Sequence, residues 1–243
     1  MNRVVSREDW NAARMELRQQ EEAHAKQSQE IAERRAKLPW FRVDREYAFD
    51  TESGRRTLAE LFEGRSQLLA YNIMFGLDYE AACPGCSNLA DHLDATLVHL
   101  NHRDVTLICF SRAPIEKLRA YKQRMGWKFP YVSTAGTDFP FDFELALRPA
   151  QVARSAEIQG MVNSPPDWLA DWATDVGTDL EHGLAENPSW IAFALEDGAV
   201  YQTYFRPAPD RDLVTTYYHL LLDMTPKGRG EDFRAWRKDE YDR

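Results

Sequence analysis

Continuous apolar runs alternate with amphipathic stretches over most of the chain, and this alternation predicts its elements. The runs at 68–75 and 104–110 are nearly continuous in apolar residues, which is typical of strands buried on both faces of a sheet. Between these runs, leucines recur every three or four residues, so we predict one helix running on from residue 83. The leucines on its buried face are Leu89, Leu93, Leu97 and Leu100.

Further elements follow the same alternation. Pro114 begins a predicted helix that Gly126 ends, and 129–133 is a short strand. A run at 188–195, the turn Asp197-Gly198 and a partner strand at 200–205 predict a hairpin. A last helix is expected at about 211–223, and its predicted core positions are Leu213, Val214, Tyr217, Leu220 and Leu221. Alternating strands and helices predict an α/β domain with right-handed crossovers.

The polar N-terminal stretch predicts a separate arm. Residues 6–37 read as a long helix, with Ser6 and Asp9 in a variant capping box and with Trp10, Ala13 and Leu17 on one thin apolar face. The predicted domains are therefore a helical arm at 1–38 and a folded domain at 39–243. The arm is expected either to stay solvated or to form a homodimer with a second copy of the chain.

Two other regions depart from the alternation. Residues 134–187 carry four prolines and several aspartates, and we interpret them as an insertion folded onto the domain near its site. Trp168 and Trp172 lie on one helical face there, and we expect them to fill the core rather than to line a substrate groove. The tail from about residue 225 is charged, and we expect it to be solvated.

Composition narrows the class of protein. The chain has 243 residues, 44% of them hydrophobic and 28% charged, which is ordinary for a soluble globular protein. A net charge of −9 argues against nucleic acid as a partner. No apolar run reaches the length of a membrane span and the N-terminus lacks a signal-peptide core, so we expect a cytoplasmic protein with no membrane partner.

The candidate chemistry is a pair of cysteines two residues apart, Cys83-Pro84-Gly85-Cys86. With Cys83 as N-cap, Pro84 falls at the first helical position, where its missing N–H is not needed. Residues three apart lie on one helix face, so the two sulfurs can form a disulfide. The helix start lowers the pKa of a thiol at Cys83, which predicts Cys83 as nucleophile and Cys86 as resolving thiol in a turn at the surface.

Two other interpretations of this motif remain open. A structural zinc site needs four ligands, and the sequence has no second pair of closely spaced cysteines; His92 lies about 13 Å along the same predicted helix. The thiols could also be buried and inert. We expect no metal and no cofactor, and Cys109, inside an apolar run, is expected to act as a small buried hydrophobe.

Several strings resemble one bacterial family of formerly unknown function whose members are described as thioredoxin-like dithiol-disulfide oxidoreductases. They cover nearly the whole chain: Leu38–Trp40, Gln67–Phe75, Cys83–Ser87, His102–Thr106, Ser111–Pro114, Arg124–Trp127 and Leu222–Arg229. The resemblance implies a thioredoxin-like α/β fold. Its central mixed sheet would be flanked by helices, with the arm before it and the insertion ahead of the C-terminal hairpin.

The resemblance also implies roles for single residues. By similarity to thioredoxins, Pro188 would take the place of their cis-proline beside the dithiol and leave a backbone edge free for a substrate segment. Ala82 and Pro84-Gly85 depart from the thioredoxin pattern and are closer to that of glutaredoxins. Pro84, Gly85 and Pro188 are thus the expected substrate contacts. Asp78 and Glu80 would oppose a thiolate if they lie close to Cys83.

The predicted function is thiol-disulfide exchange on a disulfide-containing protein or a small thiol substrate. One alternative is a thiol peroxidase of the peroxiredoxin type, in which Cys86 resolves a sulfenic acid on Cys83. Peroxiredoxins of this type carry Thr three residues before the reactive cysteine, where this chain has Glu80. The other alternative is a non-enzymatic module in which the dithiol switches the shape of the protein or holds zinc.

Overall fold

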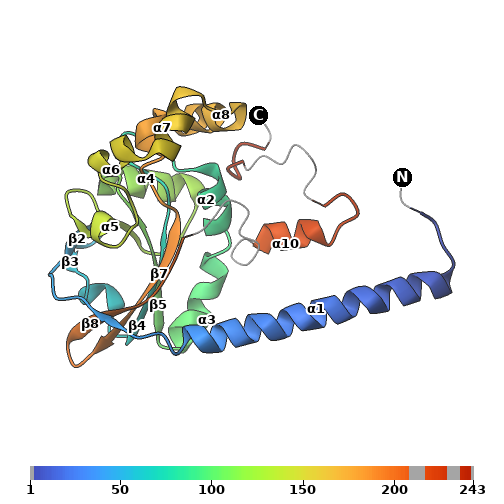
Figure 1. Cartoon of the computed structure of the whole chain (residues 1–243). Helices are drawn as coiled ribbons and strands as arrows, with labels where there is room; N and C mark the ends of the chain where they lie inside the picture. The colour runs from blue at the N-terminus through green and yellow to red at the C-terminus, as the bar shows by residue number, and fades with distance from the viewer. Residues whose placement is uncertain (1–2, 208–216, 229–235, 242–243) are drawn as a thin grey trace. The chain divides into compact units, whose positions relative to one another are not determined.

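The computed structural model describes residues 3–207, 217–228 and 236–241, and it divides the chain into two compact units, Met1–Trp40 and Phe41–Arg243 (Figure 1). The first unit holds helix α1, Arg7–Arg35, which the polar pattern predicts. The Ser6 hydroxyl accepts a hydrogen bond from the Asp9 amide, so Ser6 caps the helix as expected. No residue of α1 is buried.

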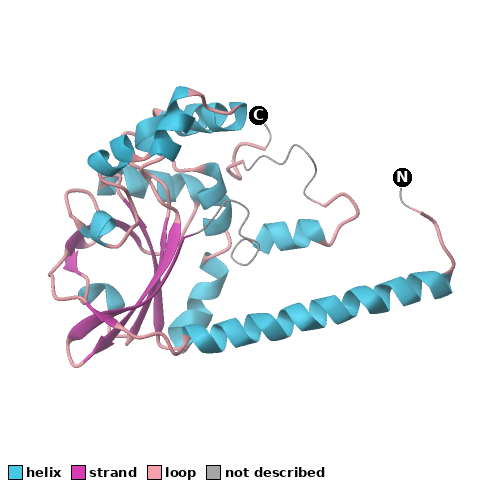
Figure 2. Ribbon diagram, in the orientation of Figure 1, coloured by secondary structure: helices cyan, strands magenta, loops and turns pink. Residues whose placement is uncertain are grey.

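The second unit is built on a mixed sheet, whose strands are magenta in Figure 2. The sheet has eight strands in the order β1-β8-β7-β4-β5-β6-β2-β3. Its strands are β1 (Phe41–Arg42), β2 (Ala48–Thr51), β3 (Gly54–Thr57), β4 (Gln67–Asn72), β5 (Val105–Ser111), β6 (Tyr131–Ser133), β7 (Ser189–Glu196) and β8 (Ala199–Pro207). The neighbours β4, β5 and β6 run parallel, whereas β7 is antiparallel to β4 and to β8. This strand order confirms the expected thioredoxin-like fold.

Helices cover both faces of this sheet. They are η1 (Glu60–Phe62), α2 (Pro84–Ala90), η2 (Asp94–Thr96), α3 (Leu97–His102), α4 (Ile115–Met125), α5 (Phe139–Asp142), α6 (Pro149–Arg154), α7 (Ala156–Asn163), α8 (Asp167–Val176), α9 (Leu180–Gly183) and α10 (Tyr217–Asp223). Within the described residues, no helix combines the length and the apolar character that a bilayer crossing needs.

The central strands separate two hydrophobic clusters because their apolar runs are buried on both sides. One cluster contains Tyr71, Phe75 and both cysteines of the motif, and it packs under α2 and α4. The other contains Phe49, Phe110 and Phe139 and lies on the opposite face. Such burial on both faces is what the continuous apolar runs predict. The dithiol therefore belongs to one defined face of the sheet.

The single helix predicted from residue 83 to Leu100 is wrong in its length. Helix α2 ends at Ala90, and α3 begins only at Leu97. In the turn between them, Asp91 accepts a hydrogen bond from the Trp127 indole, and Asp94 accepts two from the amides of Lys128 and Phe129. Carboxylates that bond outside the helix in this way favour a break over continuation. The leucines keep their inward face across the break, so their spacing did not reveal it.

The structure also corrects expected burial in two places. Tyr217 and Leu221 of α10 are exposed, and residues 211–216 of the helix predicted there lie outside the described residues, with Leu213 and Val214. Residues 134–187, interpreted as an insertion, contain helices α5 to α9 between β6 and β7, and their two tryptophans do not both fill a core. Trp168 is 60% exposed, whereas Trp172 is half-buried against Tyr79.

Candidate active site

The two cysteines of the motif lie at the start of α2, as their sequence predicts. Cys83 is the N-cap residue and Pro84 follows in the first helical turn. The Cys83 amide donates to the Met74 carbonyl at 2.9 Å, which fixes this cysteine to the loop after β4. The Cys83 carbonyl accepts from the Ser87 amide and from the Ser87 hydroxyl, each at 2.9 Å. Backbone contacts on both sides therefore hold Cys83 in one position.

Both cysteines are free thiols, and the interaction between them shifts their pKa values in opposite directions. The hydrogen bond from the Cys86 thiol is the main cause that lowers the pKa of Cys83 to about 7 from its ordinary 9.0. The amides of Cys86 and Gly85 and the Trp172 indole N–H, 3.3 Å from the sulfur, act in the same direction against the effect of burial. Donors that favour the charged form are the usual route to a reactive thiol.

Cys86 is shifted in the opposite direction. Donating its hydrogen bond to Cys83 and lying buried both raise the pKa of Cys86 well above its ordinary value. The Tyr71 hydroxyl donates to Cys86 and lowers that pKa only in part. Strong burial raises the pKa of Tyr71 itself, so this phenol stays protonated and remains a donor. Near pH 7 about half of the molecules therefore hold a thiolate on Cys83, while Cys86 keeps its proton.

Cys83 is less accessible than a surface turn implies. Its exposed fraction is 8%, that of Cys86 is 4%, and Pro84 is buried, so only Gly85 of the motif is exposed. The cover comes from α8, whose Trp172 side chain reaches the Cys83 sulfur. In Figure 1 the insertion helices α6 to α8 gather at the end of the sheet where α2 begins. The tryptophan expected in the core is thus part of the site.

Neighbouring residues fix the position of the Trp172 indole. The Tyr79 ring meets it edge-on, with centroids 6.1 Å apart, and the Tyr79 hydroxyl donates to the Gly183 carbonyl at 2.9 Å. Gly183 has to be a glycine there, because a Cβ atom would lie 2.7 Å from the Trp172 ring. The indole is therefore packed on one side by a phenol and on the other by bare backbone.

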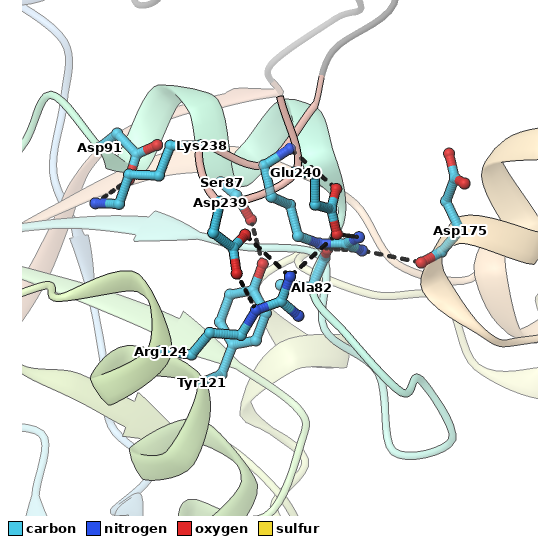
Figure 3. A network of polar contacts seen from close by, with 10 residues as sticks. Ala82, Ser87, Asp91, Tyr121, Arg124, Asp175, Lys238, Asp239 and Glu240 are labelled. Atoms are coloured by element: carbon cyan, nitrogen blue, oxygen red, sulfur yellow. Dashed lines mark hydrogen bonds and ion pairs between the residues drawn. The ribbon is translucent and has the colours of Figure 1, made fainter. Parts of the chain in front are cut away.

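Arg237, in the tail that the sequence suggests is solvated, is 3% exposed. It belongs to the network of polar contacts around Ala82, Asp175 and Glu240 that Figure 3 shows. Its guanidinium donates to the Ala82 carbonyl at 2.7 and 3.0 Å and to the Asp175 carbonyl at 3.0 Å. It also pairs with Glu240 at 2.9 Å. Asp239 and Glu240 in turn pair with Arg124 of α4. The tail thereby joins the residue before Cys83 to the end of α8.

The expected free edge at Pro188 is wrong. None of the described residues has a cis peptide bond, so Pro188 is trans. The Asn187 amide donates to the Leu145 carbonyl at 3.0 Å, and the Asn187 carbonyl accepts from Asn72 Nδ2 at 2.9 Å. The Leu147 amide donates to the Ala185 carbonyl at 2.8 Å. The insertion itself pairs with the backbone that a substrate segment was expected to use.

A buried ion pair lies on the same side of the site. The Glu186 carboxylate contacts Arg112 at 2.8 Å, and burial raises the pKa of Glu186 to about 7. A Cβ atom on Gly76 would lie 3.0 Å from this carboxylate and 2.9 Å from the Tyr79 ring. Residues 185–187 therefore lie next to Tyr79 and, through it, next to the Trp172 cover.

The two acidic residues expected to oppose a thiolate have other neighbours. Asp78 Oδ2 lies 3.7 Å from His182 Nε2, and Glu80 packs against the backbone of Gly177. Within the described part of the chain, no three His, Cys, Asp or Glu side chains are grouped closely enough to hold a metal ion. Cys109 is fully buried in β5, where burial raises its pKa.

Strand order and site together define a thioredoxin-like protein with a dithiol at the start of its first core helix. Comparison with protein families then places the chain in one of them. The family described as bacterial protein of unknown function, DUF899, matches residues 1–241, and the chain belongs to it. None of the curated proteins compared with the chain matches it.

The solved structures that match the chain include peroxiredoxins and a hypothetical protein, all at low sequence identity. A mutant of PrxQ from Xylella fastidiosa is 11% identical, with a TM-score of 0.44 over 66% of this chain and 77% of that one. Peroxidoxin BcpB from Mycobacterium tuberculosis is 13% identical, with a TM-score of 0.36 over 70% and 80%. A hypothetical protein from Sinorhizobium meliloti 1021 is 15% identical, with a TM-score of 0.38 over 76% and 80%.

Proposed function

We propose that the protein is a thiol-disulfide oxidoreductase in which Cys83 attacks and Cys86 resolves. The observation that carries this proposal is the opposite displacement of the two sulfur pKa values across one hydrogen bond. A thiolate is the attacking species in exchange, and a retained thiol beside it is the second reactant. Pro84 and Gly85, between the two, hold them in reach of each other.

The reaction proceeds in two exchanges. The Cys83 thiolate attacks one sulfur of the substrate disulfide, a mixed disulfide forms, and the other substrate half leaves as a thiolate. Cys86 then loses its proton to water and attacks the Cys83 sulfur, which releases the second half. The substrate gains two electrons and the protein is left with a Cys83–Cys86 disulfide. An external thiol must reduce that bond before another cycle.

Trapping the mixed disulfide tests the proposal. In Cys86→Ser, the first exchange proceeds and the second cannot, so the adduct on Cys83 should persist in a nonreducing gel or an intact mass spectrum. Cys109→Ala in the wild-type background is the matched control and should form no lasting adduct. Failure of Cys86→Ser to form an adduct while Cys83 still reacts with iodoacetamide would contradict the proposal.

A second candidate, thiol peroxidase activity, is favoured by the small exposed fraction of Cys83. A hydroperoxide needs little space: its terminal oxygen is transferred to the thiolate, an alcohol or water leaves, and Cys86 condenses with the sulfenic acid to release water. The two activities are separated by measuring peroxide consumption and disulfide reduction with the same reduced protein. Peroxide consumption without disulfide reduction would replace the first proposal by the second.

A further inference from the structure

Within the described residues, the backbone edge at 185–187, on the Tyr79 side of the dithiol, is already paired and is not free for a peptide. An extended chain binds such a site by adding a strand, which uses unpaired amide and carbonyl groups. Here the pairs Asn187 to Leu145 and Leu147 to Ala185 flank an antiparallel bridge between Ala146 and Glu186. The Asn187 carbonyl also accepts from Asn72 and from the Ser189 hydroxyl. A protein substrate would have to displace the chain's own segment.

The space above Cys83 is also restricted. Trp172 donates to the sulfur at 3.3 Å and leaves Cys83 8% exposed. Gly183 lies close against the indole, since a Cβ atom on that residue would lie 2.7 Å from the ring. Tyr79 packs against the indole from another side. A reactant must therefore pass a closely packed aromatic side chain to reach the sulfur.

The helix that carries Trp172 is tied to the dithiol loop at its C-terminal end. The Val176 carbonyl accepts from the amides of Glu80 and Ala81, at 2.8 and 3.3 Å. Arg237 bridges the carbonyls of Asp175 and Ala82. These bonds hold the cover in place, and several of them would have to break together for α8 to swing away.

The geometry points to a low-molecular-weight disulfide as the substrate of this dithiol, with Trp172 as the residue that excludes protein disulfides. This inference rests on the proposed function and deepens it. A small disulfide can present one sulfur in line with Cys83 without a backbone partner, whereas a disulfide in a folded protein brings a broad surface with it. The electrons come from the Cys83–Cys86 dithiol, and two small thiols leave.

Single-turnover kinetics of the full-length protein test this inference. The protein is reduced, freed of reductant, and mixed with either 2-hydroxyethyl disulfide or insulin at equal disulfide concentration. Loss of reduced Cys83 is followed by alkylation and mass spectrometry. The small disulfide should oxidise the wild type at least about tenfold faster than insulin does, the scale on which a shaped pocket discriminates.

Variants of the two insertion tryptophans locate the selectivity. Trp172→Ala should raise the insulin rate relative to the small-disulfide rate by about tenfold. Trp172→Phe keeps an aromatic cover and should keep the selectivity, although both rates fall because Cys83 loses a donor. Trp168→Ala, on the exposed side of the same helix, is the matched control and should change neither rate. If Trp172→Ala does not fold, Trp172→Leu makes the same comparison.

The outcomes separate this inference from the proposed function. Equal rates with both substrates in the wild type, or a selectivity that Trp172→Ala and Trp172→Leu leave unchanged, would overturn the inference and leave the oxidoreductase proposal standing. No oxidation of the dithiol by either disulfide would overturn both. A fast, selective wild type with a relaxed Trp172→Ala supports both.

Discussion

Cys83, at the start of α2, and Cys109, inside β5, place sulfur in two different kinds of buried environment. Cys109 is fully buried without a hydrogen-bond donor among the causes of its shift, and desolvation raises its pKa. Cys83 is 8% exposed, but donors from Cys86, two amides and Trp172 lower its pKa to about 7. Burial alone therefore does not decide whether a cysteine is inert.

Cys86 also shows that burial alone does not set the pKa of a cysteine. It lies three residues from Cys83 and is similarly buried, but it gives its hydrogen bond rather than receiving one, and its pKa is raised. What distinguishes the two is the direction of the hydrogen bond between them. One motif therefore supplies both the proposed nucleophile and the proposed resolving thiol.

The largest effect on activity is expected from removing the sulfur of Cys83. Cys83→Ser should lower the rate of disulfide reduction by at least about a thousandfold, since the attacking group is lost. The rate is measured with 2-hydroxyethyl disulfide and an external reductant. Retention of more than a tenth of the wild-type rate in Cys83→Ser would mean that another group attacks.

Among the described residues of the tail, Arg237 should contribute most to stability. Arg237→Met leaves the Ala82 and Asp175 carbonyls without their donor and Glu240 without its buried partner, which should cost about 3 kcal/mol. Urea unfolding of the reduced protein measures this. Lys238→Met is the control: its pair with Asp91 is partly exposed and should contribute under about 1 kcal/mol. Equal losses in both variants would show that the guanidinium does not hold the site together.

Removing one hydrogen-bond donor should raise the pKa of Cys83, in the direction in which burial already raises that of Cys109. In Trp172→Phe the indole N–H is lost, and the pKa of Cys83 should rise by about one unit. At pH 7 the alkylation rate should then fall about fivefold, because less of the thiol is ionised. The pH profile of Cys83 alkylation gives the shift. An unchanged profile would mean that the Cys86 thiol and the backbone amides lower the pKa of Cys83 without help from Trp172.

The smallest effect on the reaction rate is expected from replacing Cys109, in β5. Cys109→Ala should leave the disulfide reduction rate within about twofold of wild type and cost about 1 kcal/mol of stability through the small cavity it leaves. Kinetic assays and urea unfolding check the two values. A large loss of activity in a folded Cys109→Ala would give the third cysteine a role in the reaction.

The sequence predicts those parts of the fold and site that depend on local pattern. The apolar runs give β4 and β5, the Asp197-Gly198 turn gives the hairpin, and the spacing in Cys83-Pro84-Gly85-Cys86 gives the N-cap and the adjacent sulfurs. Each of these follows from residues a few positions apart, where the backbone geometry is nearly fixed.

The contacts that complete the site join distant residues and could not be predicted in this way. Trp172 lies 89 residues after Cys83, and Arg237 lies 155 residues after Ala82. An arginine in a charged tail and a tryptophan on an amphipathic helix each have an ordinary local explanation. The paired edge before Pro188 was missed for the same reason, because its partner, Leu145, belongs to the insertion.

The pH dependence of Cys83 alkylation tests the central claim most directly. Because its pKa is lowered from 9.0 to about 7, the reactive thiolate should appear on raising the pH through about 7 in the native protein, and through about 9 after unfolding. Iodoacetamide with residue-resolved mass spectrometry should label Cys83 with that midpoint and leave Cys86 and Cys109 unlabelled at pH 7. A native midpoint near 9 at Cys83, or labelling of Cys86 first, would contradict the account.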